Sequence, residues 1–245
     1  TSRDGSPYFR MTFEDLDLIE PIRKALVQEG YTTPTPIQSE AIPIVSQGYD
    51  LLGCAQTGTG KTAAFSIPII QRLYLQKKKG YKRGIKALIL TPTRELAIQI
   101  CDELRGLLTY YKNIRVAVVY GGAKIEGQIK QLKNHPQIVV ATPGRLMDHY
   151  KRHTLSFDKV QTVVLDEADR MLDMGFYDDI MQVYKLLPET CQTIMFSATM
   201  PPKIRTLAQT ILKNPEEVKI AISRPPETIM QTAYVCYDMQ KLRIL

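Results

Sequence analysis

The sequence has few of the residues that build metal centres or disulfide frameworks. Its 245 residues include three histidines and four cysteines, and the cysteines are widely scattered with no C-x-x-C pair. These spacings do not complete a structural zinc site. We therefore interpret the cysteines as reduced core residues and expect a cytoplasmic protein. They are Cys54, Cys101, Cys191 and Cys236.

Long apolar runs are also absent. No stretch approaches the ~18 consecutive apolar residues that a membrane-spanning helix needs, and the chain does not open on a signal-peptide pattern. We expect residues 1–10 to be a cloning remnant ahead of a natural start at Met11. There is no internal repeat or low-complexity tract, and we expect no membrane partner.

The composition is sufficient for a sizeable core. Hydrophobic residues make up 44% of the chain, which is enough for one large domain or two small ones. The formal net charge of +7 favours polyanionic partners. This charge still lies within the range of roughly 2 to 8 that is ordinary for soluble domains, so it does not establish nucleic-acid binding by itself.

The most informative segment is a glycine-rich loop, A-Q-T-G-T-G-K-T, at residues 55–62. It follows a short apolar segment, 50–54, that predicts a buried strand, and it precedes residues 62–75, whose apolar spacing predicts a helix. A phosphate-binding loop requires this order of strand, glycine turn and helix. The alternative is a chance glycine-rich turn.

The residue types in this loop suit a triphosphate. Gly58 and Gly60 let backbone N–H groups approach phosphate oxygens, Lys61 supplies a positive charge, and the Thr62 hydroxyl can hold Mg²⁺. Ala55 stands where the strict pattern has its first glycine. We predict a nucleotide site formed by Ala55, Gln56, Thr57, Gly58, Thr59, Gly60, Lys61 and Thr62.

An acidic tetrad, D-E-A-D, follows the apolar run 160–165. It would lie at the carboxyl end of a parallel strand, where open α/β sheets bind ligands. Asp166 would orient Mg²⁺, largely through water, and Glu167 would polarise the water that attacks the γ phosphate. A solvated acidic strand end is the alternative. The predicted catalytic residues are Lys61, Asp166 and Glu167, and the predicted metal-binding residues are Thr62 and Asp166.

Apolar strands alternate with helical patterns along the chain. This alternation predicts an α/β fold with a mainly parallel sheet of about seven strands, flanked by helices on both faces. The predicted strands are 51–54, 87–91, 116–120, 138–141, 163–165, 193–196 and 218–222. The predicted helices, besides 62–75, are 19–29, 93–111 and 201–213.

Several short motifs directly follow predicted strands. They occupy residues 92–97, 121–122, 142–145 and 197–199. The carboxyl ends of parallel strands share one edge, so we expect these motifs to converge with the loop and the tetrad. Each motif is weak alone, and T-P-G-R at 142–145 is more typical of a turn.

The densest basic run is K-K-K-G-Y-K-R-G at residues 77–84. It is flanked by a predicted helix and a predicted strand, so we interpret it as a solvated loop. A secondary nucleic-acid contact is the alternative.

In this order, the segments resemble the first RecA-like P-loop domain of a DEAD-box RNA helicase. The resemblance covers residues 11–222 and includes G-Y-T-T-P-T-P-I-Q at 30–38, which is similar to the family's adenine-recognition segment. Phe13 lies seventeen positions before Gly30, where the family has an aromatic residue. The sequence around Phe13 and 174–176 is similar to the bacterial RhlE-type branch.

The resemblance implies roles for individual residues. Gln38 would read the N6 and N7 edge of adenine, with Phe13 and Tyr31 at the base, although a polar residue at a helix N-terminus is an alternative for Gln38. The implied RNA-backbone contacts are Pro92, Thr93, Arg94, Gly122, Thr142, Pro143, Gly144 and Arg145. The implied coupling residues are Asp169, Ser197 and Thr199, and a helix cap is the alternative for the last two.

The resemblance also implies a domain organisation. Residues 11–222 would form the first helicase domain, and 223–245 would form a linker and the truncated start of a second RecA-like domain. Nothing in the sequence matches the second domain's arginine finger, which contributes ~10³ to 10⁵ in rate in many NTPases. We therefore expect a monomeric lobe that binds nucleotide and hydrolyses it weakly.

The implied function is that of an ATP-dependent RNA helicase with ATP as substrate, Mg²⁺ as cofactor and single-stranded or locally duplex RNA as partner. An ATP-gated RNA clamp that holds RNA without unwinding it would use the same residues. A P-loop DNA helicase or a nucleotide kinase is disfavoured by Gln38, the tetrad and the strand-end motifs.

Overall fold

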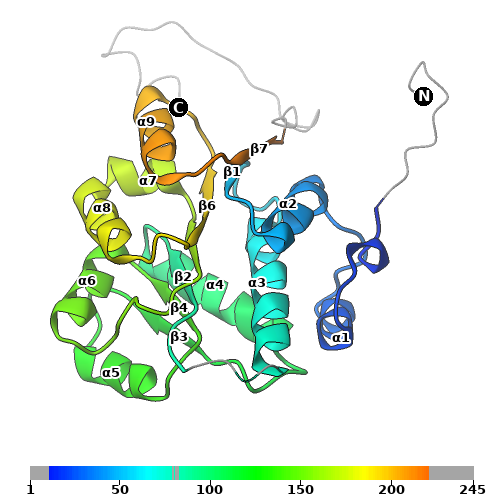
Figure 1. Ribbon diagram of the computed structural model, residues 1–245, viewed down its shortest axis with the longest axis horizontal. Coiled ribbons are helices and arrows are strands. Elements are labelled where there is room, and N and C mark those ends of the chain that lie inside the picture. Colours follow the sequence, from blue (N-terminus) through cyan, green and yellow to red (C-terminus); the bar gives the residue numbers. More distant parts are fainter. Residues whose placement is uncertain (1–10, 79, 81–82, 221–245) are drawn as a thin grey trace, which may run out of the picture.

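The computed structural model describes residues 11–78, 80 and 83–220 (Figure 1). Within this part, seven strands form one sheet in the order β3-β4-β2-β5-β6-β1-β7, and all neighbouring pairs are parallel. The predicted sheet is therefore confirmed. The strands are β1 Leu51–Cys54, β2 Ala87–Leu90, β3 Val116–Val119, β4 Ile138–Ala141, β5 Thr162–Leu165, β6 Gln192–Ser197 and β7 Glu216–Lys219. The predicted cloning remnant at 1–10 and the predicted linker and start of a second domain at 223–245 lie outside the described residues.

Helices cover both faces of this sheet. The predicted helices at 19–29, 62–75, 93–111 and 201–213 correspond to α1, α3, α4 and α9. The helices are η1 Glu14–Leu16 (a 3-10 turn), α1 Glu20–Gln28, α2 Pro36–Gln47, α3 Lys61–Lys78, α4 Arg94–Leu107, α5 Ile125–Lys133, α6 Pro143–Lys151, α7 Ala168–Asp173, α8 Tyr177–Leu186 and α9 Pro202–Ile211. In the described part of the chain, no helix has the length and apolar character to cross a membrane.

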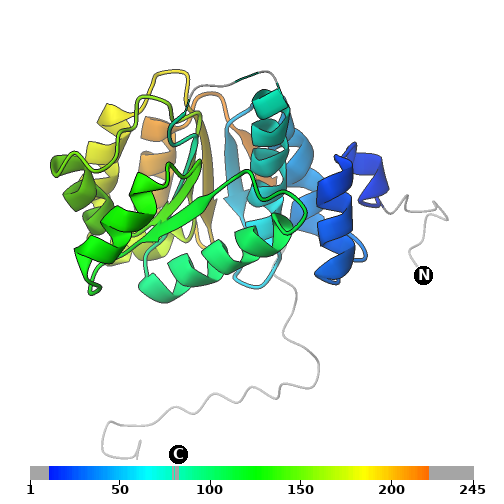
Figure 2. The same cartoon turned by 90° about the horizontal axis from the view of Figure 1, so that it is seen from below.

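Alternate residues of each strand face the two helix layers. In β2, Ala87 and Ile89 join the apolar cluster formed with α1 to α4, whereas Leu88 and Leu90 join the cluster formed with α5 to α9. Figure 2 shows the sheet between these layers, with α1 to α3 in blue and cyan on one side. A sheet buried on both faces explains why its central strands read as continuous apolar runs.

The edge strand β7 differs from its prediction. The apolar pattern predicted a strand over 218–222, but the strand begins at Glu216 and pairs with β1. Only Val218 is buried in it, while Glu216, Glu217 and Lys219 are exposed. Charged residues are typical of edge strands because they discourage pairing with other chains, and here they masked the strand signal.

The T-P-G-R motif is also different from the predicted turn. Thr142 has an extended backbone at the N-cap of α6, and Pro143 is the first residue of that helix. Proline suits this position because its missing N–H would have no helical partner there. Gly144 and Arg145 therefore belong to the first turn of a helix rather than to a loop.

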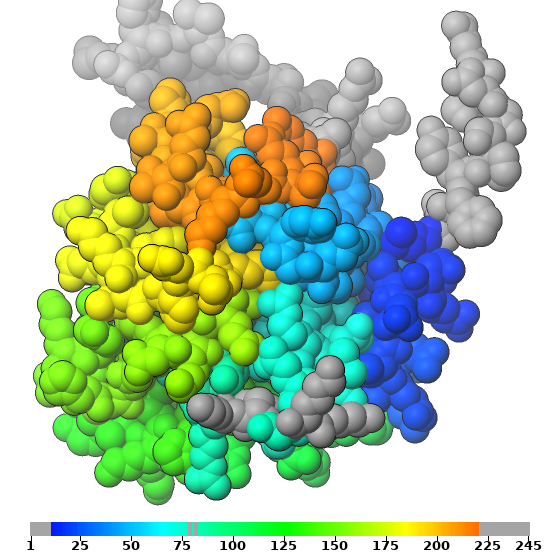
Figure 3. Space-filling model, viewed as in Figure 1, coloured from blue at the N-terminus to red at the C-terminus, as the bar shows by residue number. Residues whose placement is uncertain are grey.

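Helix α2 packs beside the last described strand. Helix α2 contacts β7 as well as α3 and β1. In the space-filling view of Figure 3, the light blue of α2 adjoins the orange of the last described elements. The N-terminal helices therefore complete the domain rather than forming a separate unit.

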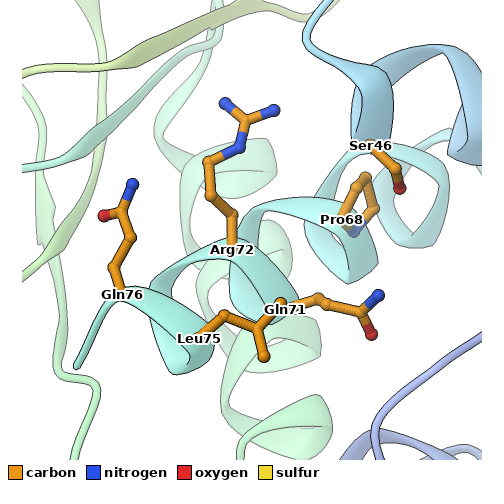
Figure 4. A pocket seen from close by; sticks show the side chains of 6 residues that line it. All are labelled: Ser46, Pro68, Gln71, Arg72, Leu75 and Gln76. Carbon is orange, nitrogen blue, oxygen red and sulfur yellow. The ribbon is translucent and has the colours of Figure 1, made fainter. Parts of the chain in front are cut away.

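Arg72 ties α3 to its neighbours from the middle of the helix. Its Nη1 donates to Thr162 Oγ1 at 2.9 Å, and its Nη2 donates to the carbonyl oxygen of Val45 at 2.8 Å. Figure 4 shows the guanidinium extending away from Gln71 and Leu75. Burial lowers the pKa of Arg72 from its ordinary value, but a guanidinium remains charged at neutral pH. The contact joins α2, α3 and β5.

Replacing Gly53 with alanine is expected to destabilise the fold. Gly53 pairs with Phe196 across β1 and β6, and an added Cβ would lie 2.3 Å from Phe196 Cε1. Such overpacking costs about 1–3 kcal/mol, measurable by urea unfolding. Gly127→Ala in α5 is the control, because its Cβ would meet nothing within 4 Å and alanine favours a helix by up to about 1 kcal/mol. Equal stability of both variants would contradict the close contact.

Candidate functional site

The predicted motifs converge at the carboxyl edge of the sheet. The amide of Ala55, after β1, donates to the carbonyl oxygen of Ser197 at 3.1 Å, and the amide of Asp166, after β5, donates to that of Leu90 at 2.9 Å. On the other side of β2, the Thr142 amide donates to the carbonyl oxygen of Val119 at 3.1 Å. The strand ends therefore bring the glycine loop, the tetrad and the other motifs to one surface.

The glycine loop turns through two left-handed residues. Gly58 has φ +82° and Gly60 has φ +91°, values that residues with a Cβ rarely adopt. A Cβ at Gly60 would also lie 2.5 Å from Gln38 Nε2. Thr59 Oγ1 donates to the carbonyl oxygen of Gln56 at 2.7 Å and closes the turn. The loop leads directly into the N-terminus of α3, where free amides and the helix dipole favour an anion.

Lys61 and Asp166 form a buried ion pair. Lys61 Nζ lies 3.3 Å from Asp166 Oδ1, and the two side chains are 5% and 4% exposed. Apart from this pair, the ammonium has no hydrogen-bond partner among the described residues. Burial raises the pKa of Asp166, Lys61 opposes this shift, and the adjoining Glu167 adds to it. A buried ammonium whose N–H donors are not all used is suited to binding phosphate oxygens.

Glu167 has an unusual backbone conformation. Its φ is 55° and its ψ is 50°, in the left-handed region, and it forms the N-cap of α7. Its Oε1 accepts from Thr57 Oγ1 at 3.0 Å, and its Oε2 accepts from Arg170 Nη1 at 3.2 Å. Backbone strain of this kind is common where a side chain must be positioned for function. The carboxylate thus lies against the glycine loop.

Asp169 connects the tetrad with residues 197–199. Its Oδ2 accepts from the amide of Thr199 at 3.0 Å and from Thr199 Oγ1 at 2.8 Å, while Ser197 Oγ donates to the carbonyl oxygen of Thr199 at 2.7 Å. Burial pushes the pKa of Asp169 upward, but the hydrogen bonds from Thr199, Arg170 and Ser197 outweigh this and hold it below its ordinary value. Neither Ser197 nor Thr199 caps α9, whose N-cap is Pro201.

Gln38 lies at the start of α2 and also touches the glycine loop. Its Oε1 accepts from the amide of Thr35 at 3.0 Å as part of a capping box, and its Nε2 donates to the carbonyl oxygen of Gly60 at 3.1 Å. Phe13 is only 7% exposed and meets Tyr31 edge-on at a centroid distance of 6.2 Å. The base-stacking role of Phe13 stays a prediction, since its ring is largely covered.

Two of the predicted RNA-contact residues begin α4. Thr93 is its N-cap and accepts from the amide of Leu96 at 3.3 Å, while the neighbouring Pro92 is buried. The guanidinium of Arg94 lies over the ring of Tyr120, 5.1 Å from its centroid. This cation–π contact orients an exposed arginine at the same edge as the loop.

The start of α6 lies beside the glycine pair that follows β3. Thr142 Oγ1 accepts from the amide of Gly121 at 3.3 Å, and Arg145 Nη1 donates to the carbonyl oxygen of Ala123 at 2.9 Å. Gly122 has φ +80° and is exposed. The N-termini of α4 and α6 thus present free amides at neighbouring points of the edge, which is the arrangement that a phosphate backbone requires.

Known proteins with this sequence pattern and fold identify the family. The family model described as DEAD/DEAH box helicase matches residues 35–207. The chain belongs to the DEAD/DEAH box helicase family. This DEAD-box chain is 48% identical over 236 residues to the ATP-dependent RNA helicase CshA of Limosilactobacillus reuteri, with 96% of the chain and 46% of the relative covered.

Other relatives agree with this assignment. The DEAD-box ATP-dependent RNA helicase RhpA of Helicobacter pylori (strain ATCC 700392 / 26695) is 46% identical over 242 residues, covering 98% of the chain and 48% of the relative. The solved structure of a DEAD box protein from the hyperthermophile Methanococcus jannaschii has a TM-score of 0.78 and 42% identity, covering 85% of this chain and 56% of that one. The DEAD-box chain spans about half the length of these curated relatives, and its RhlE-type branch stays a prediction.

Sequence reasoning missed several residues of the DEAD-box site. Thr35 could have been found, because Thr35-x-x-Gln38 is a capping-box pattern. Tyr120 lies between β3 and the glycine pair, but only the fold brings it under Arg94. Arg170 follows the tetrad, and its contact with Glu167 depends on the left-handed turn at that residue.

Proposed function

We propose that this chain is the nucleotide-binding lobe of an ATP-dependent RNA helicase, in which ATP hydrolysis is stimulated by RNA and coupled to local unwinding of duplex RNA. The buried Lys61–Asp166 pair carries the proposal, because it lies on the same edge as the helix N-termini suited to a phosphate backbone. The names of the relatives, which call them ATP-dependent RNA helicases, support the same reading.

The residues present fit ATP and Mg²⁺. Lys61 has unused donors, Gly60 keeps the loop free of a Cβ, and Thr62 and Asp166 offer the oxygen ligands that Mg²⁺ prefers. When bound, Mg²⁺ supplies positive charge that neutralises the phosphates. Lys61 would then hold the β and γ phosphates. The Glu167 carboxylate would orient the attacking water and accept its proton, with Thr57 and Arg170 holding it in place.

RNA would be held by its backbone alone. The eight predicted contacts consist of small side chains, free helix amides and two arginines, which can position phosphates without reading bases. Asp169 would couple the sites, because it joins the tetrad to residues 197–199 through Thr199. We further propose that the lobe is monomeric, acts in the cytoplasm and works with a second RecA-like domain.

The complete protein should hydrolyse ATP faster when RNA is present. The measurement is the steady-state ATPase rate with and without single-stranded RNA, and with DNA of the same sequence as the control. A rate that RNA does not change, or equal stimulation by DNA, would contradict the proposed coupling to RNA.

RNA affinity should depend strongly on salt. If about four phosphates of a single strand are contacted, the slope of log affinity against log salt is expected to be near −3. Fluorescence anisotropy with a short labelled RNA, measured at several salt concentrations from about 50 to about 200 mM, gives this slope. A flat response would argue against binding through the backbone.

Gln38→Ala should weaken the preference for ATP over GTP. The amide can pair with the adenine edge, and alanine cannot. The variant also loses a capping box, which costs about 1 kcal/mol, so folding is checked by thermal unfolding. Competition of ATP and GTP for a fluorescent nucleotide measures the preference. Gln47→Ala, at the exposed end of the same helix, is the control. Equal affinity of the wild type for both nucleotides would refute the role.

A further inference from the structure

A second basic surface lies at the amino ends of the strands, whereas the nucleotide site lies at their carboxyl ends. Arg115 directly precedes β3, and Arg83 lies shortly before β2, so both are at the amino ends of strands. Lys77 is in the last turn of α3, the helix that begins at Lys61. These two lysines are sixteen positions apart, which corresponds to ~24 Å along a helix. The two edges are therefore well separated.

This surface is hollowed and basic. A hollow of about 480 Å³ is lined by Lys77, Arg83, Lys112 and Arg115, and none of its described lining residues is acidic. A neighbouring hollow of about 280 Å³ shares Arg83 with it and adds Lys159. We call the strip formed by these five cations the basic groove.

Within the part of the chain that the structure describes, no carboxylate forms an ion pair with a cation of the basic groove. None of the five takes part in an ion pair with another residue that the structure describes. Two of them are held by backbone carbonyls instead: Lys77 Nζ donates to Asn113 and Arg115 Nη1 donates to Asn134, both at 2.7 Å. These contacts hold the side chains in place while leaving their charge available.

Ordinary structural roles explain only part of this arrangement. A lysine in the last turn of a helix, such as Lys77, stabilises the helix dipole. Arg83, Arg115 and Lys159 lie outside every helix. Five cations thus line two adjoining hollows that have no acidic residue among their described lining residues, and such clustering is a feature of nucleic-acid surfaces.

We infer that the basic groove binds the phosphate backbone of an RNA segment that flanks the segment held at the nucleotide edge. The inference rests on the proposed function, which supplies RNA as the partner. Phosphates suit the groove because guanidinium and ammonium groups bind them with charge-assisted hydrogen bonds. The cations extend through two adjoining hollows, which matches a linear polyanion better than a single small anion.

The test compares a short and a long RNA on the 245-residue chain. The groove variant combines Arg83→Gln, Lys112→Gln and Lys159→Gln, three exposed positions. The control variant combines Arg23→Gln, Lys185→Gln and Arg205→Gln, which are exposed on α1, α8 and α9 and change the net charge equally. RNAs of about six and about thirty nucleotides, both without secondary structure, extend over about 20 Å and about 100 Å at the ~3.4 Å per nucleotide of a stacked strand. Only the long RNA can therefore reach both edges.

The groove variant should bind the long RNA at least tenfold more weakly than the wild type, and its salt slope should fall by about 2, as loss of three phosphate contacts requires. Its affinities for the short RNA and for ATP should be unchanged, and the control variant should bind like the wild type.

Other results would overturn the inference. An equal loss of affinity for the long RNA in both variants would show that the net charge, and not the groove, is responsible. If the wild type bound the short and the long RNA with equal affinity, the groove would have no role in RNA binding. The proposed function would still stand in that case. Unchanged RNA binding with lost binding of polyglutamate would assign the groove to an acidic protein. If the wild type binds neither RNA, the proposed function fails and the inference fails with it.

Discussion

Glu167→Gln is expected to slow ATP hydrolysis by the complete protein by about 10²- to 10⁴-fold, the usual contribution of a positioned base. The amide keeps the size of the side chain and can still accept one of its two hydrogen bonds, but it cannot accept a proton from water. ATP affinity should change little, because Glu167 contacts Thr57 and Arg170 rather than the ammonium of Lys61. Single-turnover hydrolysis with saturating RNA measures the chemical step.

Asp173→Asn is the matched control for this experiment. Asp173 is the last residue of α7, the helix that Glu167 caps, and it is exposed in an ion pair with Lys203. Its replacement removes the same charge at a distance from the glycine loop, so the ATPase rate should stay at the wild-type value. A Glu167→Gln enzyme with an unchanged rate would show that another group is the base.

Lys61→Met should lose measurable ATP binding. The ammonium is the buried cation of the site, and each hydrogen bond to a charged group contributes about 1.5–3 kcal/mol. Calorimetric titration of the 245-residue chain with ATP measures the loss. Lys185→Met, an exposed lysine of α8, should bind like the wild type. Wild-type affinity in the Lys61 variant would remove that lysine from the site.

The same substitution should destabilise the protein in a pH-dependent manner. Breaking a buried ion pair leaves Asp166 uncompensated, which costs about 3–5 kcal/mol at neutral pH. Burial already raises the folded-state pKa of Asp166, and loss of Lys61 would raise it further. A group with a raised folded pKa stabilises the fold at low pH and loses that contribution as pH rises through this pKa.

The difference in unfolding free energy between Lys61→Met and the wild type should therefore shrink as pH falls and Asp166 takes up a proton. Urea unfolding at several pH values gives the difference, and Lys61→Met/Asp166→Asn is the control, because its stability should not follow this trend. A difference that is constant with pH would contradict an uncompensated Asp166 carboxylate.

Local sequence predicted the parts of the site that are contiguous in the chain. The loop at residues 55–62 and the tetrad each follow an apolar strand, so the parallel sheet alone brings them to one edge. Helices α2 and α5 to α8 were not predicted, although α1 and α9, with 9 and 10 residues, were. Helix α6 begins inside the T-P-G-R motif, whose composition is typical of a turn, and α7 begins inside the tetrad.

Contacts that depend on the fold could not be predicted. The Arg94–Tyr120 pair joins residues 26 positions apart, and the burial of Phe13 depends on its packing beside Tyr31. Glu167 has a left-handed conformation that non-glycine residues seldom adopt, so its sequence alone gives no sign of it. These features are set by packing and have no local pattern.

The hydrogen bond from Gln38 to Gly60 has a consequence for genetic studies of this protein. Any larger residue at position 60 would collide with the amide of Gln38. A substitution at Gly60 that is chosen to weaken phosphate binding would therefore also disturb the selection of the base by Gln38. Mutational phenotypes at these two positions cannot be separated into a phosphate effect and a base effect, and they should be epistatic rather than additive.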